Sequence, residues 1–486
     1  MVQRRLPQPL QHSTSAFSIL LALMVSGFAM VGASGCATYT DHVREAKQDA
    51  LQGRTQQAVE RLNKAIGAEE SHQYPEKLTS ENTLMLLERA TLLQAIGKYK
   101  LAARDMMIAD QQLDWLDIGA QGKAKIGKYM FSGSSVKYRA PPFERLLLNT
   151  LNMVNFMAVG DYEGAQVEAR RFSIVEYFFL NDESKTLLPE SLALGNYLGG
   201  VAFEATGEYN QAARYYADAY RYGLRTSRFE RRLVDLFRIT GYGGKGKGDA
   251  VQQLVDRSRA GSVLSFEEYR KQYVDGELLM VVQSGMAPYK EGKKYPVGQA
   301  IAYANAHSYN YNYTLSAKEK SRAREMAVSG ALKWISFPQL TEKGLPGQRN
   351  VNIFVDGREA AVFMGSNIER QVEHAWERIS GALMVAAITR MITRAAAGAG
   401  AREATQQATG KSGLGILAQL AVEGSMLAAD KPDTRSWSML PGRIKLARVR
   451  LPDGSYPVKV KVAGRTESRN VEIGSGVRVV NFSRNR

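Results

Sequence analysis

Cysteine is almost absent from this 486-residue chain, which contains only Cys36. A single thiol cannot form an internal disulfide, so packing must stabilise the fold, and a chain of this length can bury enough apolar surface to do so. Histidine is also scarce: the five residues are scattered, and no two have the H-x₃-H spacing of metal ligands. The sequence therefore predicts neither a thiolate nor a histidine metal site.

The common catalytic motifs are missing as well. The sequence has no G-x-S-x-G, no P-loop, and no S-x-x-K with its partner motifs. The glycine-rich run Gly241–Gly248 is not a convincing phosphate loop, because it lacks a preceding strand and a Ser or Thr after its lysine. We therefore expect a protein that is not an enzyme and needs no cofactor.

The N-terminal residues have the composition of an export signal. Arg4 and Arg5 precede an apolar run from Ala16 to Val31, and small residues precede Cys36. A basic start, an apolar centre and small residues before a cut site are typical of secretory signals. Because the run is short and interrupted by serine and glycine, it does not predict a membrane-spanning helix. Residues 1–35 are predicted to be removed.

The sequence Ala33-Ser34-Gly35-Cys36 resembles the lipobox of bacterial lipoproteins, although the usual box has Leu in place of Ala33. The resemblance implies cleavage before Cys36 and lipidation of its thiol, for example with palmitate. Ala37 is not the Asp that favours the inner membrane in enteric lipoproteins, so the resemblance implies an outer-membrane anchor and a chain facing the periplasm. Ordinary secretion with a chance or buried cysteine is the alternative.

Basic residues outnumber acidic ones, and the excess is uneven. The whole chain has a net charge of +16, and residues 431–486 hold thirteen Lys and Arg against four Asp and Glu, which gives +9. In an exported protein such a surface would meet anionic lipid or glycan rather than nucleic acid. A solvated strand face would show the same excess.

Residues 36–240 are predicted to form paired helices that turn at glycines 53, 97, 160 and 207. Around these glycines, small residues and large apolar residues recur at helical spacing. The clearest copy is Ala90, Leu93, Gly97, Tyr99, Ala102, Met106 and Ala109. The pattern is similar to tetratricopeptide repeats, although the period is irregular, and Gly119–Pro142 predicts a long loop. The resemblance implies a solenoid whose concave face binds proteins.

The last repeat contains candidate partner-binding residues. Arg offers a fork that suits carboxylates, and aromatic side chains can line a groove. The alternative is that the arginines lie on a solvated outer face and the aromatic side chains pack between repeats. The candidates are Arg214, Arg221, Arg225 and Tyr216.

The run Gly241–Gly248, with five glycines in eight residues, predicts a linker, and residues 249–486 predict a β-rich domain.

Within this domain, two short helices (Val251–Arg259 and Phe266–Tyr273) are expected first, and Ala304–Tyr313 is expected to be irregular or edge structure. Apolar or alternating runs typical of strands are Leu278–Val282, Ala331–Phe337 (ending before Pro338), Asn350–Val355, Arg358–Met364, Ile444–Leu451, Tyr456–Val462 and Val471–Phe482.

A helical insert is predicted at about residues 367–430. The capping box Ser366–Glu369 would open a helix that continues to about Ala397. Gly398–Gly415 predicts a loop, and Ile416–Ala429 a return helix. The predicted fold class is α+β: an all-α repeat solenoid, then a sandwich or barrel-like β domain with an inserted helical hairpin.

The order of lipobox, paired helices and β domain resembles an uncharacterised family of Gram-negative tetratricopeptide lipoproteins. The segments that carry this resemblance are Pro142–Arg145, Gly285–Lys290 and Thr434–Trp437 with Leu440-Pro441. It implies a lipid-anchored scaffold that binds envelope proteins through its repeats. The alternative is a peptidoglycan- or glycan-directed factor, an activator or binder of wall-synthesis machinery, that uses the basic C-terminal domain.

Overall fold

A computed structural model describes residues 39–112, 114–115, 138–180, 187–242, 249–258, 262–307, 314–330, 332–341, 350–409 and 432–484. The predicted signal, Cys36 and the return helix Ile416–Ala429 lie outside the described residues, as do most of the predicted loop and linker. The fold is α+β, with most helices in the N-terminal part and β-sheets in the C-terminal part.

Four antiparallel helical pairs form the N-terminal part. They are α2 (Tyr39–Leu51) with α3 (Thr55–Ala65), α4 (Ser80–Ala95) with α5 (Tyr99–Gln112), α7 (Pro142–Ala158) with α8 (Tyr162–Leu180), and α9 (Ala193–Ala205) with α10 (Tyr209–Arg221). Between the helices of each pair, one of the four predicted turn glycines has φ between 77° and 84°. Glycine enters this left-handed region without the steric cost that a Cβ brings, so the predicted turns are confirmed.

Small residues allow the paired helices to approach closely. Gly200 on α9 faces the ring of Tyr216 on α10, and a Cβ at that position would overlap the ring. Gly195 meets the ring of Phe172 on α8 in the same way. The helical region continues through α11 (Ser227–Thr240), α12 (Ala250–Arg257) and α13 (Phe266–Tyr273). A 3₁₀ turn, η1 (Pro189–Leu192), precedes α9, and two short strands, β1 (Asp114–Trp115) and β2 (Arg139–Ala140), pair in parallel.

Two four-stranded sheets form most of the C-terminal part. The first has the order β12-β3-β9-β8, with β12 (Val477–Arg484), β3 (Glu277–Ser284), β9 (Arg443–Arg450) and β8 (Val362–Asn367). The second has the order β11-β10-β6-β7, with β11 (Arg465–Ile473), β10 (Gly454–Val462), β6 (Val351–Val355) and β7 (Arg358–Ala360). The β12–β3 pairing is parallel and the others are antiparallel.

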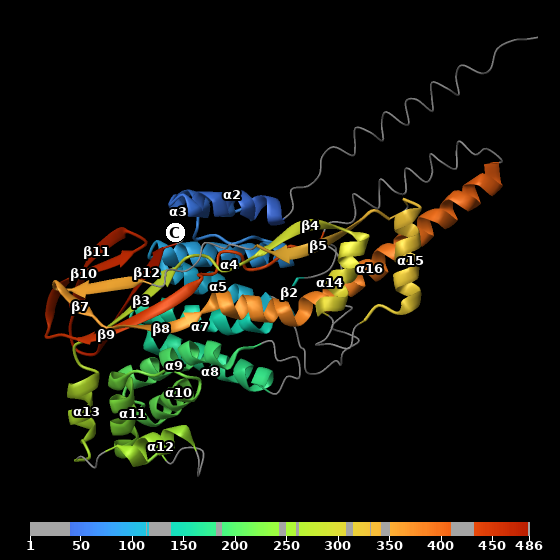
Figure 1. Cartoon of the computed structure of the whole chain (residues 1–486). Helices are drawn as coiled ribbons and strands as arrows, with labels where there is room; N and C mark the ends of the chain where they lie inside the picture. The colour runs from blue at the N-terminus through green and yellow to red at the C-terminus, as the bar shows by residue number, and fades with distance from the viewer. Residues whose placement is uncertain are drawn as a thin grey trace, which may run out of the picture.

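Strand β3 explains how the layers are stacked. Leu279 and Val281 belong to the apolar core shared with the helices, while Leu278, Met280 and Val282 belong to the core shared with the second sheet. Alternate residues of a strand face opposite sides of the sheet, so a strand covered on both sides becomes a continuous apolar run. Figure 1 shows the resulting order: helices, first sheet, second sheet.

The first sheet packs directly on the helical pairs. Strand β12 contacts α4 and α7, and β8 contacts α9. One apolar cluster therefore includes helix residues and residues of the first sheet. The division into two domains stays a prediction, and the two parts share this core.

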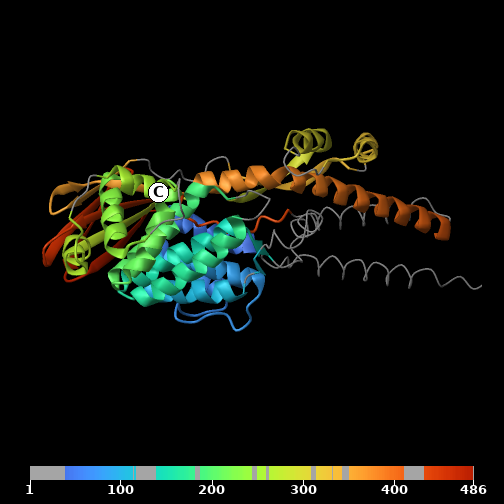
Figure 2. The ribbon, with the colours of Figure 1, turned by 90° about the horizontal axis from the view of Figure 1, so that it is seen from below.

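A third group of elements, which we call the arm, extends from this body. It comprises β4 (Lys290–Pro296), β5 (Trp334–Leu340), α14 (Val297–His307), α15 (Ala317–Val328) and the long helix α16 (Ile368–Thr409). They share a separate apolar core that includes Trp376 and Phe337. Figures 1 and 2 show α16 running outward from the body with α14 and α15 beside it.

By length and composition alone, one stretch within the described residues could cross a membrane: Ile368–Ala396 of α16. However, 56% of the most apolar 18-residue stretch of this helix is buried inside the protein. This burial shows that α16 packs against neighbouring elements. Apolar residues at helical spacing lie in or against the cores: Ile368, Val372, Trp376, Ile379 and Leu383.

The predicted ends of α16 are wrong. The side chain of Asn367, the last residue of β8, accepts a hydrogen bond from the backbone N–H of Arg370 at 3.3 Å, so the residue that caps the helix is Asn367 and not Ser366. The helix also continues through the predicted loop as far as Thr409. Residues 398–409 contain Ala, Arg, Glu and Gln, whose helix propensity outweighs that of the two glycines.

Three further predictions need correction. Ala304–His307 are helical and end α14, whereas 308–313 lie outside the described residues. Val471–Phe482 is divided between β11 and β12 by a turn in which Gly476 has φ 91°. Strand β5 does not stop before Pro338, because this proline lies in a two-stranded ribbon opposite Gly292, and an edge strand can do without one N–H donor.

Candidate functional site

The sheet-facing side of the helical pairs holds a segment of the chain itself. Residues Thr434–Pro441 lie against α2, α4 and α7 and are held there mainly by two buried carboxylates. We call this contact the junction. It joins all three segments that carried the family resemblance, although these lie far apart in the sequence.

Glu88 of α4 forms one half of the junction. Its carboxylate accepts hydrogen bonds from the backbone N–H groups of Ser438 (2.6 Å) and Met439 (2.8 Å) and from the Ser438 hydroxyl (2.8 Å). The hydroxyl of Tyr39 lies 2.7 Å from both Glu88 and the Ser436 carbonyl oxygen. Burial raises the pKa of Glu88 above its ordinary value, against the effect of these donors.

Glu144 of α7 forms the other half. It accepts hydrogen bonds from the Trp437 backbone N–H (3.2 Å) and the Tyr138 hydroxyl (2.8 Å). The indole N–H of Trp437 donates to Thr91 of α4 at 2.9 Å. Burial raises the pKa of Glu144 to about 7.

The segment Gly285–Lys290 completes the junction. The Ala287 N–H donates to the Leu440 carbonyl at 2.9 Å, and the Lys290 ammonium donates to the Arg435 carbonyl at 3.2 Å. The neighbouring Lys47 of α2 lies over the ring of Tyr289, and burial lowers its pKa to about 8. Because these groups bind backbone N–H and carbonyl groups of the chain itself, the junction acts as a structural contact between helices and sheet.

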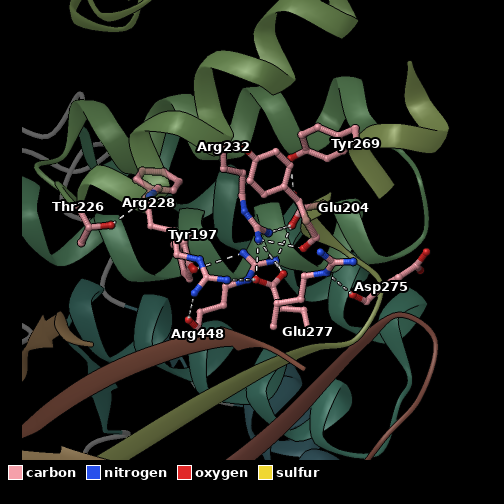
Figure 3. Close-up of polar contacts among 12 residues, drawn as sticks. Tyr197, Glu204, Thr226, Arg228, Arg232, Tyr269, Asp275, Glu277 and Arg448 are labelled. Atoms are coloured by element: carbon pink, nitrogen blue, oxygen red, sulfur yellow. Dashed lines mark hydrogen bonds and ion pairs between the residues drawn. The ribbon is translucent and has the colours of Figure 1, made fainter. Parts of the chain in front are cut away.

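A second buried polar cluster lies where α9, α11, β3 and β9 meet (Figure 3). Glu204 of α9 accepts hydrogen bonds from Arg232 of α11 and Arg448 of β9, each at 2.7 Å. Glu277 of β3 accepts from Arg232 at 2.6 Å and lies 2.6 Å from Arg448. All four side chains are buried. Two carboxylates and two guanidinium groups balance, so the interior holds no net charge here.

The electrostatics of this cluster follow from the pairing. Burial by itself would raise the pKa of Glu204, but the charges of Arg232 and Arg448 outweigh it and hold the pKa below its ordinary value. The hydroxyls of Tyr216 and Tyr269 also donate to Glu204. With no access for a substrate, the cluster is suited to joining helices and sheet rather than to proton transfer with a ligand.

The predicted partner-binding residues occupy different environments. Tyr216 is fully buried beside Glu204, so its side chain has no surface to offer a partner. Arg221 is paired with Asp218 at 2.7 Å and also with Asp249. The guanidinium of Arg225 lies 3.4 Å from the centre of the Tyr220 ring.

Arg214 lies 4.6 Å from the ring of Tyr215, whose hydroxyl bonds Ser173 of α8 at 3.0 Å. Of the four candidates, Arg214 is therefore the one placed beside α8.

The face of α8 that points away from the sheet is exposed and apolar. Val167, Ile174 and Tyr177 lie along it, with Ile174 exposed by 59% and Tyr177 by 70%. Their spacing of seven and three residues places them on one side of the helix, and Glu163 and Arg170 lie among them. We call this surface the α8 face. This face could not be predicted from the sequence, because the same apolar spacing is typical of a buried helix contact.

Part of the positive charge of the C-terminal strands is paired internally. Arg443 pairs with Glu369 at 3.0 Å, and Arg484 pairs with Glu467 at 2.8 Å. Arg435, Arg448 and Arg469 also have acidic partners. Five of the thirteen cations are therefore paired, whereas others, among them Lys459, Lys461 and Arg478, are exposed.

We also considered a surface hollow and groups of possible metal ligands as candidate sites. A shallow hollow of about 440 Å³ lies between the start of α3 and the strands β11 and β12, where Glu467 already pairs with Arg484. Among the described residues, no group of three or more His, Cys, Asp or Glu side chains could hold a metal ion.

A scan against protein-family models finds no match for this chain, and a search of curated proteins finds none either.

Proposed function

We propose that the protein is a lipid-anchored scaffold of the bacterial cell envelope. Lipid on Cys36 would hold it at the outer membrane with the chain in the periplasm, and partner proteins would bind to helical pairs of the tetratricopeptide type. The support for such repeats is local: four pairs with turn glycines in the left-handed region and small residues at the helix contacts.

The observation that carries the proposal is the contrast between the two sides of the helical pairs. The sheet-facing side contacts the first sheet and the segment Thr434–Pro441. The α8 face instead exposes Ile174 and Tyr177 to solvent. Exposed apolar side chains with a polar rim are typical of protein–protein contacts. We therefore place partner binding on the α8 face rather than in the groove that the repeat resemblance implies.

The alternative, a wall- or glycan-directed factor, would depend on accessible cations of the C-terminal strands. Internal pairing of Arg443, Arg448 and Arg484 leaves fewer of them available. We therefore favour the scaffold.

The test compares Ile174→Asp with Val263→Asp in the full-length lipoprotein. Both positions are exposed and apolar, at 59% and 63%, but Val263 lies outside the α8 face. After crosslinking of intact envelopes and affinity purification, Ile174→Asp is expected to lose a partner that wild type and Val263→Asp retain. Equal recovery of the same partner by all three proteins would contradict the proposal.

A further inference from the structure

The arm carries an unusual concentration of basic side chains. Eight belong to β4, α15 and the residue before β5, against three acidic residues in the same elements. Lys290 donates to the Arg435 carbonyl, and none of the other seven forms an ion pair with another described residue. They are Lys293, Lys294, Lys318, Lys320, Arg322, Arg324 and Lys333.

The acidic residues of these elements offset only part of this charge, because three carboxylates stand against eight cations. The carboxylate of Glu319 accepts hydrogen bonds from the Ser316 N–H and hydroxyl and from Thr389 of α16. Glu325 accepts one from Ser321 at 2.8 Å. The arm therefore has a net positive surface, in contrast to the paired arginines of the C-terminal strands.

Large apolar side chains of the arm are exposed as well. Val328, the last residue of α15, is exposed by 90%, and Trp334, the first residue of β5, by 47%. The chain folds back between them, because the Leu332 N–H donates to the Met326 carbonyl at 3.0 Å. This contact brings Trp334 close to the end of α15, with Lys333 beside it.

This combination points to one kind of partner. Tryptophan favours the boundary between headgroups and acyl chains, and clustered Lys and Arg are attracted to anionic lipid, at roughly 1 kcal/mol for each cation near the surface. We propose that the arm docks on a bilayer surface rich in anionic phospholipid, with Trp334 and Val328 entering the headgroup boundary and the cations of α15 and β4 contacting phosphates.

The position of the arm is compatible with such docking. Figures 1 and 2 show it extending from the body. The start of α2 lies at its base: Thr40 is 2.8 Å from Thr434, and Lys47 lies over Tyr289, which precedes β4. Tyr39 follows Cys36 by three residues, so a lipid at Cys36 would be attached a few residues from the base of the arm. The docking itself does not require that lipid.

The test uses the mature chain with Cys36→Ser, which cannot be acylated, and vesicle flotation. Vesicles of equal parts phosphatidylglycerol and phosphatidylcholine are compared with vesicles of phosphatidylcholine alone. We expect binding to the mixed vesicles, weakened by salt, and little binding to the neutral ones. Absence of binding to mixed vesicles, or equal binding to both, would overturn the proposal.

The paired substitution Arg322→Gln with Arg324→Gln locates the surface. Each removed charge is expected to weaken binding about five-fold. The matched control is Lys459→Gln with Lys461→Gln, which removes two exposed cations from β10 and is expected to leave binding unchanged. If the control weakens binding as much as the arm variant does, the surface is not the arm.

A Trp334→Ser variant tests the apolar contact separately. Binding should weaken, and the blue shift of tryptophan emission that accompanies binding of the unsubstituted chain should be lost. A blue shift that persists in this variant would show that Trp334 does not enter the bilayer. Because this chain is not acylated, failure of the lipid test would leave the scaffold proposal standing.

Discussion

At the scale of single residues, the molecule depends on buried charges that hold distant segments together. Glu204, Glu277, Arg232 and Arg448 come from four different elements. Removing one member of a buried ion pair leaves its partner desolvated and uncompensated, which costs more than the pair itself contributes.

Arg448→Met is therefore expected to lower the free energy of unfolding by about 3–5 kcal/mol. Arg450→Met, two residues further along β9 at an exposed position, is the matched control and should change stability by less than about 0.5 kcal/mol. Chemical denaturation monitored by circular dichroism measures both. Similar losses in the two variants would show that the cluster has no special role.

Glu144 predicts a dependence of stability on pH. Burial raises its pKa from 4.5 to about 7, so between these values the folded state binds a proton that the unfolded state has released. This group therefore makes the protein less stable as pH rises from about 4.5 to 7. Above this window its contribution is constant.

Glu144→Gln removes this titration. Relative to wild type, its free energy of unfolding should rise by up to roughly 3 kcal/mol between about pH 5 and pH 8. Glu267→Gln, at an exposed position on α13, is the control and should follow the wild-type curve closely. Denaturation at a series of pH values checks this, and parallel curves for wild type and Glu144→Gln would contradict the raised pKa.

At the scale of elements, local patterns were enough to predict most helices, turns and strands. The turn glycines and the strand β3 follow from backbone sterics and apolar runs, which depend on neighbouring residues. The junction could not be predicted in this way, because Thr434–Pro441 has no periodicity and Trp437 bonds a residue 346 positions away. The α8 face could not be predicted for a related reason. The spacing of apolar residues along a helix does not show which side of the helix lacks a neighbouring element.

Two glycines should respond in opposite directions to the same substitution. Gly97 lies between α4 and α5 with φ 77°, so Gly97→Ala is expected to cost about 1–2 kcal/mol of stability. Gly298 lies in the exposed first turn of α14 with open space around it, so Gly298→Ala should stabilise by up to about 1 kcal/mol. Thermal or chemical unfolding distinguishes the two, and a loss at both positions would contradict the conformational argument.

At the scale of the whole molecule, the helices and the first sheet share one apolar core, and the junction adds polar contacts between them. We propose that two outer surfaces meet other molecules: the α8 face a protein, and the arm a bilayer.

Cys36→Ser should release the protein from the membrane fraction after a high-salt wash, since lipid would then be missing and arm contacts screened. Retention after that wash would remove the anchor from the proposal.

The central claim, that partners bind the α8 face, is tested most directly by site-specific photocrosslinking in intact cells. A photoreactive amino acid would replace Ile174 on α8 or, as control, Lys459 on β10, both exposed. The proposal predicts a discrete crosslinked species from position 174 and none of that size from position 459. No crosslinked species from position 174, or the same species from both positions, would contradict it.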